Sequence, residues 1–292
     1  MKHQIPQWST SLTFRTILVV LIAVGALPGC AGTRKKDPSL VRIKGSDTML
    51  VLSQRWSEKF MALHPGVSIY AEGGGTATGI KSLINNNADI CAASRLLRPD
   101  EVSALAKAHK TLGISYLVAK DALSIYLHPA NSVKDLTLKQ LRDIFSGRIT
   151  NWAEVGGSDA NIEVFIRSPN SGTYLYFKER VLEGNAYSST AVSRPTTEAV
   201  VNSILNAPNG IGYGGIAHGN NLTHSKVNGI SPSEESVRYD LYPITRYLYL
   251  YTINKPGGIT KRFIDWILST DGQRIVKRVG YIPLWRLGES SE

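Results

Sequence analysis

The sequence predicts an α/β fold, because short buried strands and amphipathic helices alternate along the chain. Residues 162–166 form an apolar run typical of a buried strand, and residues 174–182 place apolar side chains at helical spacing. Between them lies the loop RSPNSGT, residues 167–173. The same order of strand, polar loop and helix recurs along the chain. With 292 residues, 42% of them hydrophobic and 19% charged, the chain is globular in composition and long enough for one large or two ordinary domains.

Residues 1–29 are predicted to be an export signal rather than part of the fold. A polar start is followed by an apolar run that is too short to span a bilayer comfortably. The run closes on LPGC, which ends at Cys30 and resembles the lipidation site of a bacterial lipoprotein. We therefore expect Cys30 to be lipidated and residues 30–39 to be a tether, with an uncleaved anchor helix as the alternative. In either case we expect the globular part outside the cytoplasmic membrane.

The chain has one further cysteine, Cys91. If Cys30 carries a lipid, Cys91 has no partner for a disulfide within the chain. Its apolar neighbours predict a buried structural thiol rather than a nucleophile.

The net charge of the chain is positive, at +10. Lys2 and Arg15 lie in the expected leader, which contains no acid, so the remainder carries +8. This excess suits an anionic ligand or an anionic membrane surface. The basic residues are spread out and no nucleic-acid-binding motif accompanies them, so we expect no nucleic-acid partner.

The first part of the chain contains strand, loop and helix units in succession. Residues 41–44 alternate as a strand, and Leu52, Trp56 and Phe60 then share one helix face. A strand follows at 67–71, a helix through Ile80, Leu83 and Ile84, a strand at 88–93, and a helix that starts with Pro99, Asp100 and Glu101.

Two nearly continuous strand candidates, residues 111–119 and 122–127, have no helix between them and suggest a crossing between two domains. We expect the strand candidate 242–251 to be the return crossing, and its tyrosines Tyr247, Tyr249 and Tyr251 to form packing between the domains. The other expected elements are a helix at 137–145 with a capping box, helices at 200–205, 263–267 and 275–279, a strand at 211–213, and a C-cap at Gly280. Residues 214–235 carry only weak signals.

Loops rich in hydroxyl groups follow several of the strands. They are residues 45–48, residues 73–79, Ser94 with Arg95, and residues 167–173. Ligands of open α/β sheets bind where strands end, and helix N-termini offer free N–H groups and partial positive charge to an anion. Ordinary helix caps with a surface arginine are the alternative for any single loop. The recurrence of this chemistry predicts a cradle for a tetrahedral anion, and the glycine spacing excludes a dinucleotide fingerprint.

Taken together, these segments resemble the substrate-binding protein of a bacterial phosphate ABC transporter, from about residue 41 to residue 284. The resemblance implies an α/β, periplasmic-binding-protein-like (type II) clamshell with two lobes, two crossings between them and phosphate in the cleft. Lobe 1 would comprise residues 40–121 and 244–292, and lobe 2 residues 122–243. The matching segments are GSDTM (45–49), GGGTATGI (73–80), ADICAASR (88–95), IFSGRITNW (144–152), RSPNSGT, GIGYGG (210–215), YPITRYLY (242–249) and GQRIVKRVGYIPL (272–284).

The resemblance also implies the phosphate ligands. They would be Ser46, Thr48, Thr76, Ser94, Arg95, Arg167, Ser171, Gly172 and Thr173. The family often has serine where this chain has Thr76, and some members have an aspartate, which accepts the phosphate proton, where this chain has Arg95. We add Asp47 to the site as the hypothetical proton acceptor that would reject sulfate. The alternative role of Asp47 is the N-cap of a helix over residues 49–63.

The function implied is high-affinity binding of inorganic phosphate outside the cytoplasm and its delivery to an ABC permease. We expect a lipid-anchored monomer with no cofactor and no enzymatic activity. We also expect no metal site, since none of its six histidines lies at ligand spacing with another His or Cys. The alternatives are a binding protein for sulfate, molybdate or a phosphonate, a phosphatase, or a surface protein that kept the fold without the ligand.

Overall fold

The computed structural model describes residues 39–288 of the chain. The expected leader, Cys30 and all but the last residue of the expected tether lie outside the described residues. Within residues 39–288, no helix is both long and apolar enough to cross a membrane.

One mixed sheet runs through the described residues, with the strand order β2-β1-β3-β10-β4-β8-β6-β7. Strands β1, β2 and β3 are mutually parallel, β10 is antiparallel to both β3 and β4, and β4 is antiparallel to β8. The strands are β1 (Leu40–Gly45), β2 (Ser68–Glu72), β3 (Ile90–Ala93), β4 (Ile114–Leu127), β5 (Asp135–Leu136), β6 (Glu163–Arg167), β7 (Val192–Arg194), β8 (Gly210–Gly215), β9 (Thr223–Val227) and β10 (Thr245–Thr252).

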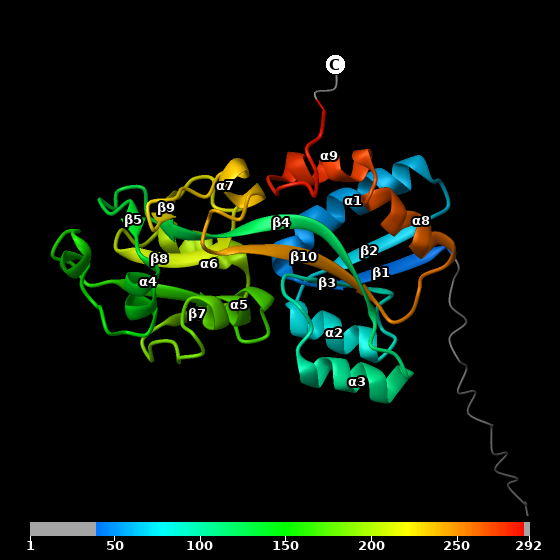
Figure 1. Ribbon diagram of the computed structural model, residues 1–292, viewed down its shortest axis with the longest axis horizontal. Helices are drawn as coiled ribbons and strands as arrows, with labels where there is room; N and C mark the ends of the chain where they lie inside the picture. The colour runs from blue at the N-terminus through cyan, green and yellow to red at the C-terminus, as the bar shows by residue number, and fades with distance from the viewer. Residues whose placement is uncertain (1–38, 289–292) are drawn as a thin grey trace, which may run out of the picture. The chain divides into compact units, whose positions relative to one another are not determined.

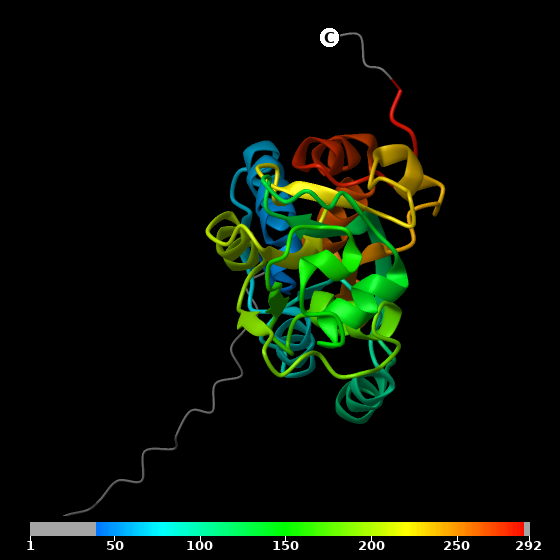
Figure 2. The same cartoon turned by 90° about the vertical axis from the view of Figure 1, so that its left-hand side faces the viewer.

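Helices cover the sheet on both sides of the long central strands (Figure 1). Helix α9 packs against α1 and α8, and the turned view shows α1 and α9 near each other at the top (Figure 2). The α-helices are α1 (Leu50–Leu63), α2 (Thr76–Ile84), α3 (Pro99–His109), α4 (Leu138–Phe145), α5 (Gly172–Arg180), α6 (Thr197–Leu205), α7 (Glu234–Arg238), α8 (Gly258–Ile267) and α9 (Thr270–Val279). Two short 3₁₀ helices, η1 (Asp47–Met49) and η2 (Trp152–Val155), complete the elements.

The apolar side chains gather in two large hydrophobic cores. One contains Trp152, Phe177 and Tyr213, and the other contains Trp56 and Phe263. Strands β4 and β10 extend from one core to the other, and they lie side by side through the middle of Figure 1.

The change from one core to the other occurs within a few residues of each central strand. On β4, Val118 and Ala119 belong to one core and Ala122 and Leu123 to the other. Between them lie buried polar residues, including Asp121. The lobe limits that we predict, after residues 121 and 243, fall close to this polar stretch, and the division into lobes itself stays a prediction.

Several predicted elements are confirmed by the structure. The capping box at the start of α4 is formed, because Thr137 Oγ1 accepts a hydrogen bond from Gln140 N and Gln140 Oε1 accepts one from Thr137 N. Helix α9 ends at Gly280, whose φ of 101° lies in the left-handed region that glycine tolerates. Cys91 is fully buried beside Ile80 and Leu83, and burial raises the pKa of its thiol.

Other expectations about the elements are wrong. Residues 111–119 and 122–127 are not two strands, because β4 continues through Lys120 and Asp121. Lys120 forms an ion pair with Asp240, and Asp121 forms one with Arg246. Because both charges are paired, the strand can pass through a buried region without a break.

The tyrosine stripe also differs from the expectation. The rings of Tyr249 and Tyr251 stack at 5.8 Å, and Tyr251 belongs to the small cluster around Cys91 rather than to packing between the two large cores. Strand β9 lies in the weak stretch 214–235 and helix α7 begins at its end, and both were missed because they are short and polar.

Candidate anion-binding site

The loops that follow β1, β3 and β6 meet the glycine-rich loop before α2 in one buried cluster. The Asn170 backbone carbonyl accepts a hydrogen bond from Ala77 N at 3.2 Å, and Asn170 Nδ2 donates to Gly74 O at 2.8 Å. These bonds join the RSPNSGT loop directly to the glycine-rich loop, although the two are far apart in the sequence. The structure therefore brings together two helix N-termini, those of α2 and α5.

The start of α5 fits so closely against the α2 side that only glycine has room there. A Cβ added to Gly172 would lie 2.4 Å from Thr76 Oγ1 and 2.6 Å from Ser94 Oγ. No real Cβ approaches another atom so closely, so any side chain at this position would push the two loops apart. Gly172 is therefore required for the contact between the two helix starts.

The predicted hydroxyl groups are buried, and four of them lie in close pairs. Thr48 Oγ1 and Thr173 Oγ1 are 3.0 Å apart, and Thr76 Oγ1 and Ser94 Oγ are 3.4 Å apart. Ser171 caps α5, since its Oγ accepts hydrogen bonds from the backbone N–H groups of Thr173 and Tyr174. Ser46, Thr48, Thr76, Ser94, Ser171 and Thr173 are all buried. Hydroxyls can donate to an anion or accept from its proton, which suits them to an oxyanion site.

Arg167 enters this cluster from the end of β6, with only 1% of its side chain exposed. Its Nη1 donates to Thr197 Oγ1 at 2.8 Å, and its Nη2 donates to Asp47 Oδ2 at 2.8 Å and to Pro195 O. Burial lowers the pKa of the Arg167 guanidinium, and the nearby Asp47 carboxylate opposes that shift. Within residues 39–288 the buried Arg167 Nε has no hydrogen-bond partner. A buried donor left unpaired is costly, so Nε is a group that an anion would satisfy.

Asp47 does not cap the following helix, so that alternative is wrong. A 3₁₀ turn, η1, comes first, and α1 has Met49 at its N-cap with no side-chain cap bond. The Asp47 carboxylate instead accepts from Gly74 N at 2.8 Å through Oδ1 and from Arg167 through Oδ2. Asp47 thus fixes the glycine-rich loop and Arg167 at once, and its role as proton acceptor stays a prediction.

Arg95 is the predicted site residue whose side chain the structure does not bring to the cluster. Its guanidinium makes two hydrogen bonds of 2.7 Å with the Glu101 carboxylate and one with Leu96 O. Glu101 lies in the first turn of α3 and also accepts from Arg98 N. The guanidinium therefore faces the start of α3, and Arg95 fixes the chain direction after β3.

Sequence reasoning missed a second buried arginine at this place, Arg246 on β10. Its Nη1 donates to Thr173 Oγ1 at 3.0 Å, and its Nε donates to Asp121 Oδ2 at 2.8 Å. The signal was present in YPITRYLY, because Arg246 shares its strand face with the buried Leu248 and Leu250. A charged residue in phase with the buried side of a strand indicates a partner or a site.

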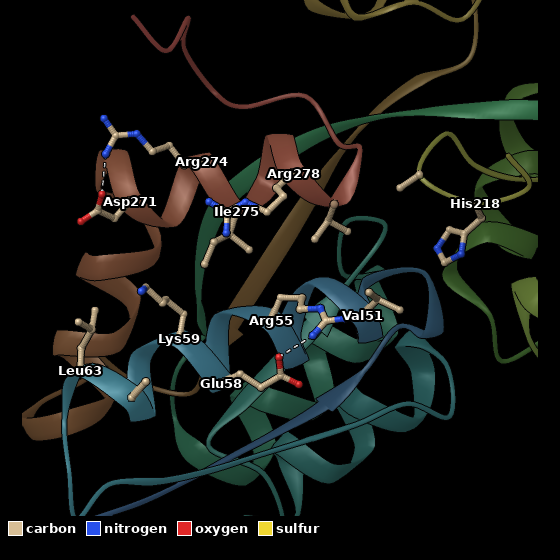
Figure 3. Close-up of a pocket in the computed structure, with 13 residues that line it drawn as sticks. Val51, Arg55, Glu58, Lys59, Leu63, His218, Asp271, Arg274, Ile275 and Arg278 are labelled. Atoms are coloured by element: carbon tan, nitrogen blue, oxygen red, sulfur yellow. Dashed lines mark hydrogen bonds and ion pairs between the residues drawn. The ribbon is translucent and has the colours of Figure 1, made fainter. Parts of the chain in front are cut away.

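Two further observations bear on what the site can do. Among residues 39–288 there is no group of three or more His, Cys, Asp and Glu side chains that could hold a metal ion. A groove of about 940 Å³ lies elsewhere, between α1 and α9, and Figure 3 shows Arg55, Lys59 and Arg278 along it. His218 lines this groove and its Nε2 lies 3.2 Å from Thr48 O.

Comparison with known proteins shows which family the chain is similar to. Residues 32–271 match the family model described as a PBP superfamily domain. The phosphate-binding protein PstS of Pseudomonas aeruginosa is 31% identical over 82% of this chain and 81% of its own length. PstS of Bacillus subtilis is 29% identical over 94% of each chain.

Solved structures show the same fold. A structure from Clostridium perfringens, named for a phosphate ABC transporter substrate-binding protein with bound phosphate, is 31% identical, with a TM-score of 0.78 over 84% of this chain and all of its own. An ABC-type phosphate transport receptor from Vibrio cholerae is 26% identical, with a TM-score of 0.69 over 83% of this chain and 99% of its own. These likenesses confirm the predicted α/β clamshell. The chain therefore belongs to the PBP superfamily and, within it, to the family of the phosphate-binding protein PstS.

Proposed function

We propose that this chain binds inorganic phosphate in the buried cluster between α2 and α5 and delivers it to an ABC permease. The observation that carries the proposal is the meeting of two helix N-termini, several buried hydroxyls and Arg167 Nε, a buried donor without a partner among the described residues. Such a cluster suits a tetrahedral anion because every oxygen can receive a hydrogen bond. The names of the relatives, phosphate-binding protein PstS, support phosphate as that anion.

The ligand groups follow from the positions of the side chains. Asp47 orients Arg167 and the glycine-rich loop, and Arg95 shapes the loop after β3 through Glu101, so neither needs to touch the anion. The proposed ligands are Ser46, Thr48, Thr76, Ser94, Arg167, Ser171, Gly172 and Thr173.

Binding rather than catalysis is favoured by the surroundings of the hydroxyls. In the described part of the chain, none of the proposed ligand hydroxyls has a hydrogen bond to a histidine that could act as a general base. His218 lies nearby, but its Nε2 faces the Thr48 backbone carbonyl and the Tyr281 hydroxyl. We propose that the chain is not a phosphatase, and that it acts outside the cytoplasmic membrane as a monomer anchored by a lipid on Cys30.

The test is calorimetric titration of the chain lacking residues 1–30, stripped of bound phosphate, first with phosphate and then with sulfate. Tight phosphate binding with little response to sulfate is expected, with a dissociation constant of about 1 μM or lower. Equal binding of sulfate would favour a general oxyanion receptor, and a lack of binding to both anions would overturn the proposal. Steady release of phosphate from a simple phosphomonoester would favour a phosphatase instead.

A further inference from the structure

The two central strands place an aspartate and an arginine opposite each other where the chain passes between its cores. Asp121 on β4 and Arg246 on β10 are register partners in the antiparallel pair. Arg246 Nε and Nη2 both lie 2.8 Å from Asp121 Oδ2. Neither side chain is more than 2% exposed, so this ion pair is desolvated.

A buried ion pair at this position is not explained by stability. Removing two charges from water costs several kcal/mol for each ion, and apolar residues of similar size often serve a core equally well. Burial raises the pKa of the Asp121 carboxyl in spite of the adjacent Arg246 guanidinium. Ile216 N donates to Asp121 Oδ1 at 3.0 Å, which fixes the carboxylate further. Stability alone therefore does not account for the pair, and its geometry is tightly held.

The Nη1 side of the Arg246 guanidinium lies among the proposed phosphate ligands. Its Nη1 donates to Thr173 Oγ1 at 3.0 Å and to Ser94 O at 3.4 Å. Thr173 Oγ1 lies 3.0 Å from Thr48 Oγ1. The Tyr176 ring covers the guanidinium, with 5.7 Å between its centroid and the Arg246 carbon Cζ. The arginine thus ends among groups from the loops after β1, β3 and β6.

We infer that Arg246 is a second anion-binding side chain of this site and that Asp121 is the positioning residue that holds it there. The inference rests on the proposed function, since it concerns the same cluster. Each guanidinium has its own carboxylate, Asp47 for Arg167 and Asp121 for Arg246. With both carboxylates engaged, two cationic donors face the anion, and the site selects the dianionic form of phosphate over the monoanion.

The decisive variant removes both charges together, so that no lone charge stays buried. The change Arg246→Gln with Asp121→Asn keeps similar shapes and polar groups. Phosphate affinity measured by calorimetry should fall about 10- to 100-fold, because one charge-assisted contact is lost from a desolvated anion. The matched control is Arg42→Gln with Asp89→Asn, a second Arg–Asp ion pair, which joins β1 to the residue before β3 and should leave the affinity unchanged.

A pH profile separates anion binding from a merely structural role. Phosphate passes from mainly monoanion to mainly dianion between about pH 6 and about pH 8, much as phosphate esters do. If Arg246 binds the anion, the loss of affinity in the paired variant should be larger at the higher pH. His218 lies near the pair, where burial lowers its pKa and the Asp121 carboxylate opposes that shift, so the comparison is made with His218→Gln in both proteins. The other titratable groups that face the pair, Tyr176 and Tyr281, have pKa values that burial raises, so they stay neutral over this pH range.

The role of Asp121 is tested by a double-mutant cycle. Asp121→Asn alone should weaken binding by about fivefold, since Arg246 is then held less firmly, and should add almost nothing once Arg246 is already Gln. Additive losses would overturn the positioning role.

If circular dichroism shows that the paired variant does not fold, the variant Arg246→Lys is measured instead. It keeps the charge but loses the fork that spans Asp121 and Thr173, and affinity should fall about three- to tenfold. Wild-type affinity in that variant, or phosphate binding within about twofold of wild type in the folded paired variant, overturns this inference alone. If the wild type itself binds no phosphate, the proposed function is wrong, and this inference is wrong with it.

Discussion

Asp47 and Arg167 form an ion pair across 120 residues of sequence, with 2.8 Å between Asp47 Oδ2 and Arg167 Nη2. Asp47 follows β1 and Arg167 ends β6, so the pair joins elements that belong to opposite halves of the sheet. The two side chains are 11% and 1% exposed, so water screens the Coulomb attraction between them less than it screens a surface pair. It therefore helps to hold the two sets of ligand loops in contact.

The first prediction concerns Arg167. Arg167→Ala should weaken phosphate binding by about 2–5 kcal/mol, because a desolvated anion loses a charged partner and Asp47 is left unpaired. Calorimetry at fixed salt measures the change. Arg180→Ala, which removes an exposed arginine on α5 that donates to Pro243 O, is the control and should bind like the wild type. If Arg167→Ala binds phosphate with wild-type affinity, Arg167 is not a phosphate ligand and the proposed site is wrong.

Asp47→Asn distinguishes the two roles still open for this residue. An asparagine can still accept from Gly74 N but no longer pairs with a full charge, so phosphate binding should weaken by about 1–2 kcal/mol. If Asp47 only orients Arg167, sulfate binding should weaken by the same factor. If Asp47 accepts the phosphate proton, only phosphate binding should weaken, and the ratio of phosphate affinity to sulfate affinity should fall. Because both carboxylate oxygens are engaged, we expect parallel losses in a competition titration.

Gly172→Ala should weaken phosphate binding without unfolding the chain. The new methyl group would meet Thr76 Oγ1 and Ser94 Oγ, so the loops could approach only with distortion. We expect at least a tenfold loss of affinity, about 1.4 kcal/mol, together with a lower thermal midpoint, because the same close contact is present in the phosphate-free chain. Gly257→Ala is the matched control, because a Cβ there meets nothing within 4 Å and its φ of −118° suits any residue. Equal effects of the two changes would show that the close contact is unimportant.

The stability of the phosphate-free chain should fall in mild acid. Burial lowers the pKa of His218 from 6.5, so the unfolded chain takes up a proton at a higher pH than the folded chain does. The free energy of unfolding should therefore decrease as the pH drops from about 6.5 toward the lowered value, by at most about 1.4 kcal/mol per pH unit for each such histidine. His224, which burial shifts in the same direction, adds to the slope.

Urea unfolding of His218→Gln at several pH values checks this. The variant should show a shallower pH dependence than the wild type. An unchanged slope in His218→Gln would mean that His218 takes up its proton equally well in the folded chain.

The parts of the site that the sequence predicts are those encoded locally. The RSPNSGT motif names a strand end, a cap and a helix start within a few residues, and Arg167, Ser171 and Gly172 lie as that order implies. Arg95 shows the limit of such reasoning. Whether its guanidinium turns to a ligand or to Glu101 depends on the start of α3, which the strand pattern leaves open.

Arg246 and Asp121 were harder to find because the sequence around each residue does not show which residue it contacts. Asp121 lies in a polar interruption that suggests a break between two strands, until its partner on β10 is known. The register of two strands more than a hundred residues apart decides which charges meet, and no short motif reports that register. The alternation of Arg246 with Leu248 and Leu250 was the one available signal, and it gives burial but not the partner.

The burial of Cys91 makes the chain suitable for an optical phosphate sensor. In a chain lacking residues 1–30 it is the sole cysteine, and its buried thiol of raised pKa would react slowly with maleimide dyes. A cysteine introduced at Pro169, an exposed residue beside the Asn170 contact with Gly74, would then take the dye selectively. The emission of that dye would report a change in the surroundings of the Asn170–Gly74 contact when phosphate binds.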